Sequence, residues 1–332
     1  MPRWTILTPV LMSLLGCWQS DPEPAPATAH DGTLRKVTLQ LNWYPEAEHG
    51  GFYAALENGY YRDEGLDVTI LRGGADVPVV QKVAAGQADF GIENADRILL
   101  MRAQEADVVA VLAPMQTSPR CLMVHEIANV ASFADLKGVT IAMNAGEPFA
   151  QFLLKKSLPN DVQVVPYTGG VSHFLRDDKH AQQGYSFSEP FLAEEQGTDP
   201  KVLLVAEAGF NPYTSCLFTR DELADEEPSL VRKMVSASVK GWKDYLASPN
   251  ATNAAIHNLN PEMSLDILAF GAEAMRPLCS PEGQESQPFG RMTAERWQNL
   301  AQQMIDTGVL EPKTVDPAKA FRAEFLPSDS PE

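Results

Sequence analysis

The chain has few of the residues that build disulfide frameworks and metal sites: four Cys and six His among 332 residues. The cysteines, at positions 17, 121, 216 and 279, form no C-x-x-C pair and share no ligand spacing with His, so neither disulfides nor a zinc site are predicted. The sequence also lacks G-x-G-x-x-G, G-K-[ST] and G-x-S-x-G, so a nucleotide fold and the common hydrolase turn are not indicated. We expect no cofactor, no metal and no catalytic residue.

Positive charge is scarce as well. Lys and Arg number 26 against 44 Asp and Glu, a net charge of −18, and no basic stripe gathers to neutralise phosphates. Nucleic acid is therefore an improbable partner. The acidic residues are spread along the chain, as in a soluble surface. We expect a monomer.

A long apolar run is missing too, because the run from Trp4 to Leu15 is shorter than the ~20 residues that span a bilayer. With Arg3 before it, this run is typical of a signal peptide. The residues Leu14-Leu15-Gly16-Cys17 resemble a bacterial lipobox, so we expect a signal peptide over 1–16, lipidation at Cys17 and a flexible tether over 17–34. The protein would be exported and held by lipid in the periplasm or on the outer face of the cell membrane. The alternative is an unmodified cysteine buried in the signal peptide.

From Lys36 onward, short apolar strands alternate with amphipathic helices, a pattern that predicts crossover connections and parallel sheets. The first series of strands runs to Leu112, the second opens near Arg120, and strongly periodic helices follow Asp221. We therefore predict an α/β protein of two lobes, with two mixed, mostly parallel sheets flanked by helices and a ligand cleft between them. The expected boundaries are 35–117 for lobe 1, 118–212 for lobe 2, and 213–332 for a return to lobe 1 and a helical C-terminal tail. The crossings, near 113–120 and 210–216, would act as hinges.

The most specific signal is the segment LNWYPEAEHGGFY at 41–53, followed by NGYYRDEGLDV at 58–68. With GQADFG at 86–91, DLKG at 135–138 and SEP at 188–190, it resembles the bacterial periplasmic-binding family for thiamine-pyrimidine precursors, nitrate and alkanesulfonates. The resemblance implies the type 2 periplasmic-binding-protein fold. It also implies an ABC importer component that captures a small-molecule solute and works with permease and ATPase subunits. A ligand-sensing ectodomain would use the same two-lobed clamp and remains an alternative.

Candidate ligand contacts follow the strands, because open α/β sheets bind ligands at the carboxyl ends of their strands. Asn42, Trp43 and His49 follow the first strand; the indole of Trp43 would stack on a flat ring and His49 would supply a hydrogen bond. The alternatives are a core aromatic for Trp43 and a helix-capping histidine for His49. In lobe 2, the turn that holds Asn144, Gly146 and Glu147 opens a helix, and the resemblance makes it a ligand-binding loop.

Two further pairs complete the predicted site. Tyr185 would flank the ligand, and the resemblance places Glu189 at the family's acidic position, where a carboxylate accepts donors from an aminopyrimidine edge and repels sulfonate or nitrate. Glu93 and Asn94 are expected as polar contacts or as a strand-end cap. We therefore expect a hydroxymethyl- or aminomethyl-pyrimidine as ligand, then riboflavin or another larger ring, and then alkanesulfonate or nitrate.

The family also includes fungal pyrimidine synthases that use a lysine-linked pyridoxal phosphate and a histidine. In this sequence Glu93 stands where the resemblance expects the lysine, and Arg97 where it expects the histidine. A Schiff base needs an amine, so the synthase role is disfavoured and a binding protein is preferred.

Overall fold

The structure is a computed structural model that describes residues 1, 2, 4, 34–126, 130–284 and 286–327. The predicted signal peptide and tether, with Cys17, lie almost wholly outside this set. Residues from Leu34 onward form one compact unit. Within the described residues, no helix is both long and apolar enough to cross a membrane.

Lobe 1 is built on a five-stranded sheet with strand order β2-β1-β3-β10-β4. Its strands are β1 (Arg35–Gln40), β2 (Leu66–Leu71), β3 (Phe90–Glu93), β4 (Val108–Leu112) and β10 (Cys216–Arg220). β1 pairs in parallel with β2 and β3, whereas β10 is antiparallel to both of its neighbours. The free edge of β4 is covered near Ala110, where Ala110 donates to Ala320 O and accepts from Arg322 N. Covering an edge in this way removes a strand that could pair with another chain.

Lobe 2 repeats this plan with strand order β7-β6-β8-β5-β9. Its strands are β5 (Arg120–His125), β6 (Thr140–Ala142), β7 (Gln163–Val165), β8 (His180–Tyr185) and β9 (Pro200–Leu204). β6 pairs in parallel with β7 and β8, and β5 is antiparallel to β8 and β9. In each sheet one strand therefore opposes the others, which confirms the predicted α/β class with mixed, mostly parallel sheets.

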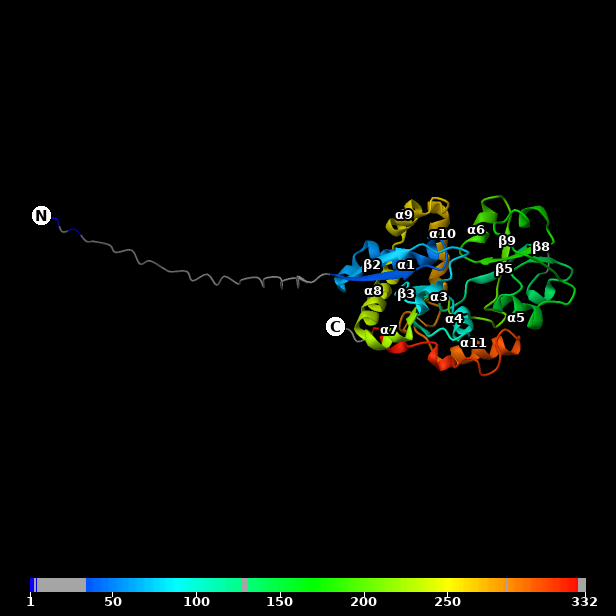
Figure 1. The fold of residues 1–332 in the computed structure, drawn as a ribbon. Helices are drawn as coiled ribbons and strands as arrows, with labels where there is room; N and C mark the ends of the chain where they lie inside the picture. The colour runs from blue at the N-terminus through cyan, green and yellow to red at the C-terminus, as the bar shows by residue number, and fades with distance from the viewer. Residues whose placement is uncertain (3, 5–33, 127–129, 285, 328–332) are drawn as a thin grey trace. The chain divides into compact units, whose positions relative to one another are not determined.

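Helices flank both sheets, and Figure 1 shows the green strands of lobe 2 beside the blue and cyan elements of lobe 1. The α-helices are α1 (Gly50–Glu57), α2 (Tyr60–Asp63), α3 (Val79–Ala84), α4 (Ala95–Arg102), α5 (Pro148–Lys156), α6 (Glu189–Glu194), α7 (Asp221–Glu226), α8 (Pro228–Ala247), α9 (Asn250–Leu259), α10 (Leu265–Cys279) and α11 (Ala294–Asp306). Single turns of 3-10 helix are η1 (Ala47–His49), η2 (Phe133–Asp135), η3 (Phe174–Arg176), η4 (Pro317–Lys319) and η5 (Ala323–Phe325).

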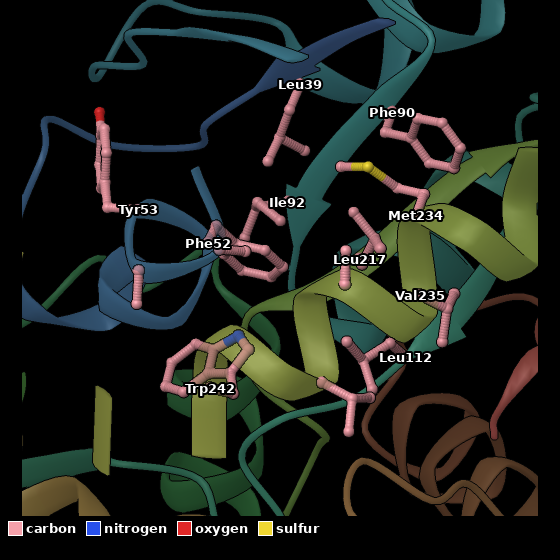
Figure 2. Packing of buried hydrophobic residues seen from close by; sticks show 14 of the residues in the cluster. Leu39, Phe52, Tyr53, Phe90, Ile92, Leu112, Leu217, Met234, Val235 and Trp242 are labelled. Atoms are coloured by element: carbon pink, nitrogen blue, oxygen red, sulfur yellow. The ribbon is translucent and has the colours of Figure 1, made fainter. Parts of the chain in front are cut away.

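The core of lobe 1 forms where α8 packs on the sheet. Figure 2 shows Met234, Val235 and Trp242 of α8 among strand residues such as Ile92 and Leu217, all of which are buried. The periodic apolar face of α8 explains this packing, since one stripe of a helix covers a sheet while the other meets solvent.

Two glycines allow α1 and α8 to approach closely. A Cβ at Gly51 would overlap the ring of Trp242, and a Cβ at Gly241 would overlap the carbonyl oxygen of Gly51 and the backbone of Ala55. Backbone atoms of the two helices are therefore in direct contact, and neither position accommodates a larger side chain without moving a helix.

The chain crosses between the lobes through residues 113–119 and 205–215, and α11 braces the second crossing. The guanidinium of Arg296 on α11 donates through Nε and Nη2 to Asn211 O, at 3.1 and 2.9 Å. It also lies 3.9 Å from the ring centroid of Tyr213. At the other end of the helix, Lys155 of α5 donates to Thr307 O. The C-terminal helix thus contacts the crossing and lobe 2 as well as lobe 1, which shows why a purely lobe 1 role for the tail is too simple.

The sheet of lobe 2 ends just before the SEP segment. β8 ends at Tyr185, and Phe187 leaves the sheet and packs in the core of lobe 1. Glu189 begins α6 and does not lie in a strand. The Pro190 ring at the start of α6 accounts for both, because a proline favours the first helical turn and cannot donate to a sheet.

We predict that Gly241→Ala lowers the free energy of unfolding by about 1–3 kcal/mol, because overlap with the backbone of α1 outweighs the gain in helix propensity. Urea unfolding measures this change. Gly146→Ala is the matched control, since a Cβ there meets nothing within 4 Å and should change stability by less than about 0.5 kcal/mol. Equal midpoints for Gly241→Ala and the unaltered protein would contradict the close helix contact.

Candidate functional site

The candidate site lies where the carboxyl ends of strands from both lobes meet. We call it the interlobe site, and its polar residues are Asn42, Glu46, Glu48, His49, Glu93, Asn94, Asp96, Arg97, Arg120, Asn144, Glu147, Tyr167, Tyr185, Glu189 and Ser215. Among these described polar side chains, two contacts cross between the lobes: Asn94 Nδ2 donates to Tyr185 Oη at 3.0 Å, and Arg97 Nη1 lies 3.8 Å from Glu147 Oε2. The structure therefore brings the predicted contacts after β3 together with those after β6 and β8.

Asn94 joins three parts of the fold. While its Nδ2 donates to Tyr185 in lobe 2, its Oδ1 accepts the backbone N–H of Ser215 in the second crossing, at 3.2 Å. Its own N–H donates to Glu93 Oε1 at 3.0 Å. The side chain of Asn94 is thus already engaged on both sides, and its first role in this conformation is to connect the lobes.

Trp43 is presented to solvent by the loop after β1. Its side chain is 42 % exposed, so the alternative of a core aromatic is wrong. It meets the ring of Tyr44 edge-on at 5.4 Å, and Arg72 lies 4.4 Å from the centroid of the Tyr44 ring. Gly73 makes this loop possible, since its N–H donates to Trp43 O at 3.0 Å and any Cβ would overlap the neighbouring backbone.

His49 lies deeper than a direct ligand contact requires. It is fully buried, and its Nε2 lies 2.9 Å from Asn42 Oδ1 and 3.1 Å from Glu48 Oε1. Its Nδ1 is buried without a partner in the described part of the chain. Glu48 in turn accepts from the hydroxyl of Ser215 at 3.4 Å. The geometry makes His49 a link between the first loop and the crossing, and direct ligand contact stays a prediction.

Glu189 is held by its own lobe. Its Oε2 accepts the N–H of Tyr185 at 2.8 Å, and its Oε1 accepts the hydroxyl of Tyr167 at 3.2 Å. Burial raises the pKa of Tyr167 and of Tyr185, so both phenols are neutral and can each donate one hydrogen bond. Glu189 keeps lone pairs for a ligand donor, but it also fixes the corner between β8 and α6.

The loop after β6 reaches the same region through the side chain of Glu147. Asn144 and Gly146 are exposed, and the N–H of Asn144 donates to the buried Gln183 Oε1 at 2.7 Å. Glu147 is the N-cap of α5 and faces Arg97 across the lobes. Glu147 thus brings this loop opposite lobe 1, and its role as a ligand-binding loop stays a prediction.

Several carboxyl groups of the interlobe site are shifted toward their neutral form. Burial raises the pKa of Glu93 to about 7 and that of Asp96 to about 6. Burial also raises the pKa of Glu46, with repulsion from Glu48 and Glu189 adding to it. Desolvation disfavours a charged carboxylate, so these groups hold protons at pH values where exposed acids have lost them. Glu93 and Arg97 also line a small cavity of about 230 Å³ with residues 75–81 and Met101.

Sequence reasoning missed Arg120, the first residue of β5. Its guanidinium carbon lies 4.1 Å from the ring centroid of Tyr185 and 4.8 Å from that of Phe149. Burial lowers its pKa, but Tyr185 and Glu189 more than offset this and the net pKa is raised. A lone arginine at the end of a crossing has no periodic pattern around it, so only the tertiary structure reveals the rings beside it. Asp96, Glu48 and Tyr167 were missed for the same reason.

Nothing in the described ranges suggests a metal centre, because no group of three or more His, Cys, Asp or Glu side chains is placed to share an ion. Cys121, Cys216 and Cys279 are free and buried. Burial raises the pKa of each of these thiols, so they are poor nucleophiles.

Two five-stranded sheets joined by two crossings, with polar groups at the strand ends between them, define the periplasmic solute-binding fold. Solved structures confirm this class. The aliphatic sulphonate binding protein SsuA from Escherichia coli superposes with a TM-score of 0.67 at 14% identity, covering 90% of this chain and 96% of that one. A sulfonate-binding SsuA from Methylobacillus flagellatus has a TM-score of 0.66 at 16% identity, over 88% of this chain and 93% of that one.

The chain belongs to the NMT1/THI5-like family, whose model matches residues 46–252. Similar relatives include the riboflavin-binding protein RibY from Chloroflexus aurantiacus, 28% identical over 93% of this chain and 91% of that protein. A formylaminopyrimidine-binding protein from Halalkalibacterium halodurans is 24% identical over 81% of this chain and 84% of its own length. A 4-amino-5-hydroxymethyl-2-methylpyrimidine phosphate synthase from Candida albicans is 27% identical over 71% of this chain and 74% of its own. Binding proteins and synthases therefore both occur among its relatives.

The raised pKa of Glu93 predicts a pH-dependent stability. A carboxyl whose folded pKa of about 7 exceeds its ordinary value of 4.5 stabilises the fold fully below 4.5, and this contribution is lost as the pH rises through 7. In the unaltered protein the free energy of unfolding should fall between pH 5 and pH 8, and Glu93→Gln should make this fall smaller by about 1–2 kcal/mol. We expect no more than this because the side chain of Glu93 is partly exposed to solvent, which weakens the electrostatic effect. Urea unfolding at the two pH values measures it. Glu57→Gln, at an exposed helix end, is the control, and identical pH profiles for Glu93→Gln and the unaltered protein would contradict the shift.

Proposed function

We propose that this protein is the solute-binding component of an ABC importer and that it captures a flat nitrogen heteroaromatic ring at the interlobe site. The observation that carries the proposal is the Asn94 to Tyr185 hydrogen bond, because it connects strand ends of opposite lobes. Hinged two-lobed proteins trap solutes between such surfaces. A ligand-sensing ectodomain is the alternative, and neighbouring genes for a permease and an ATPase would favour the importer.

The side chains around the junction suit a flat ring. Trp43 offers an exposed aromatic face, and Tyr185 offers a second ring at the strand end of lobe 2. Polar groups that are partly exposed, including Glu93, Glu189 and Asn144, supply acceptors and donors for ring nitrogens and substituents. Binding sites of this kind pair apolar walls with a few placed polar groups.

The relatives support a ring-containing ligand and change the order of the candidate ligands. One is named for riboflavin and another for formylaminopyrimidine, and both ligands contain a pyrimidine ring. The riboflavin-binding relative matches more of this chain, so riboflavin moves ahead of the hydroxymethyl- or aminomethyl-pyrimidine that the sequence favoured. Alkanesulfonate and nitrate remain third, since the carboxyl groups of the site oppose an added anion. The sulfonate-binding structures share the fold at low identity and carry no argument about ligand.

We also propose that the protein catalyses no reaction. Glu93 ends β3 where the synthase relatives are expected to carry a lysine, and a carboxyl cannot form a Schiff base.

We propose in addition that the protein is exported and that Cys17 carries a lipid anchor. We place the lobe boundaries at residues 117 and 212. Mass spectrometry of the membrane fraction would test the anchor, and an unmodified Cys17 would refute it.

A thermal-shift screen tests the ligand class directly. The soluble domain from about Ala29 should be stabilised by riboflavin, or by a hydroxymethyl- or formylamino-pyrimidine, by about 2–3 kcal/mol when the ligand is at about 100 times its Kd. Taurine tests for sulfonate binding and should not change the stability of the domain. Stabilisation by taurine, with none by any aromatic ring, would overturn the proposal.

A single aromatic substitution tests the ring-stacking wall. Trp43→Ala should weaken binding of the stabilising ring by about 10-fold, since an aromatic pair contributes about 0.5–1.5 kcal/mol beyond its buried area. Isothermal titration calorimetry measures the affinity. The exposed indole carries little of the fold, so the melting temperature without ligand should be unchanged. Equal affinities would remove Trp43 from the binding surface.

A further inference from the structure

We infer that Arg120 is the residue that selects the ligand, by donating hydrogen bonds to a neutral ring edge that carries carbonyl oxygens, as in a pyrimidinedione. This inference rests on the proposed function, since it concerns the same interlobe site and names the face of the ring that enters it. The site residues predicted from the sequence include no arginine, and the contact predicted there for an aminopyrimidine edge is a carboxylate.

The first step of the argument is position. Arg120 begins β5 at the point where the chain has just crossed between the lobes. Its backbone is fixed on both sides, because its N–H donates to Ser118 Oγ at 3.4 Å and its carbonyl accepts from Val205 N at 2.9 Å. The guanidinium therefore lies at the end of the first crossing and beside Tyr185. The hydroxyl of Tyr185 accepts the hydrogen bond from Asn94 of lobe 1.

The second step is orientation. The guanidinium carbon lies 4.1 Å from the ring centroid of Tyr185 and 4.8 Å from that of Phe149. Cation–π contacts with these two rings hold the group without using its N–H donors, which lie in the guanidinium plane. Two rings on rigid elements, β8 and the first turn of α5, thus keep an arginine in place for a partner that the protein does not supply.

The third step is the hydrogen-bond balance. Across the described residues, the Arg120 guanidinium donates to no acceptor and has no carboxylate within ion-pair distance. The nearby acids are engaged elsewhere, since Glu189 accepts from Tyr167 and Tyr185, and Glu147 faces Arg97. Arg120 is only partly exposed. A ligand that covers it must therefore provide acceptors, because buried charged donors left without partners are costly.

The fourth step is charge, which separates a neutral acceptor from an anion. Glu48, Glu93 and Asp96 surround the same junction, together with Glu147 and Glu189, whereas Arg97 is the other arginine in the site. An anion would meet one unpaired cation and several carboxyl groups, some of them charged at neutral pH. Carbonyl oxygens of an uncharged ring satisfy the guanidinium without adding negative charge. The pyrimidinedione part of an isoalloxazine has such an edge, whereas an aminopyrimidine presents an amino donor that Arg120 would oppose.

Two measurements test the selection. In the unaltered protein, calorimetry should show that lumazine, a 2,4-dioxo pteridine, binds at least about 10-fold more tightly than 2,4-diaminopteridine, a ring of the same size. Arg120→Met should weaken riboflavin or lumazine binding by about 10- to 100-fold, the range for hydrogen bonds to a charged group, and Arg120→Lys should fall between. Arg62→Met, on the exposed surface of α2, is the matched control and should bind as the unaltered protein does.

The outcomes separate this inference from the proposed function. If the unaltered protein binds aromatic rings but prefers the diamino ring, or if Arg120→Met keeps its affinity for the dioxo ring, the selection by Arg120 is wrong and the ring-binding function stands. If no aromatic ring binds, both are wrong. The comparison of the two pteridines uses the unaltered protein, so it decides the matter even if Arg120→Met fails to fold. If taurine binds tightly and Arg120→Met abolishes that binding, then Arg120 binds an anion. This result would contradict the inference that it binds the carbonyl edge of a neutral ring.

Discussion

The hydrogen bonds of Asn94 connect the parts of this clamp. One amide side chain accepts from the crossing at Ser215 and donates to Tyr185 of the opposite lobe, at 3.2 and 3.0 Å. Because Asn94 directly follows β3, these contacts place the central strand of lobe 1 against the last residue of β8.

The C-terminal helices add further contacts between the two lobes. α11 donates from Arg296 to the second crossing and contacts α5 through Lys155 and Thr307, while Phe270 of α10 packs 5.2 Å from Phe191 of α6. These contacts reach lobe 2 from a tail that follows lobe 1 in the sequence.

The interlobe site combines many carboxyl groups, and three of them are shifted toward their neutral form. Burial raises the pKa of Glu46, Glu93 and Asp96. The hydroxyl of Tyr167 donates to one oxygen of Glu189, and the backbone N–H of Tyr185 donates to the other. The sequence suggested a site that repels anions through its acids. The structure keeps that preference but adds an arginine stacked on Tyr185 and Phe149, so the site offers donors as well as acceptors.

The sequence alone determined the alternation of strands and helices and the two sheets, because buried runs such as β4 and the periodic face of α8 carry their own hydrophobic pattern. It also marked Trp43, Asn94 and Glu93, since strand ends are visible as the point where that pattern stops. It did not reveal Arg120 or the burial of His49. Which side chains meet across two lobes depends on contacts between residues far apart in the chain, and no local periodicity records them; only the tertiary structure decided those.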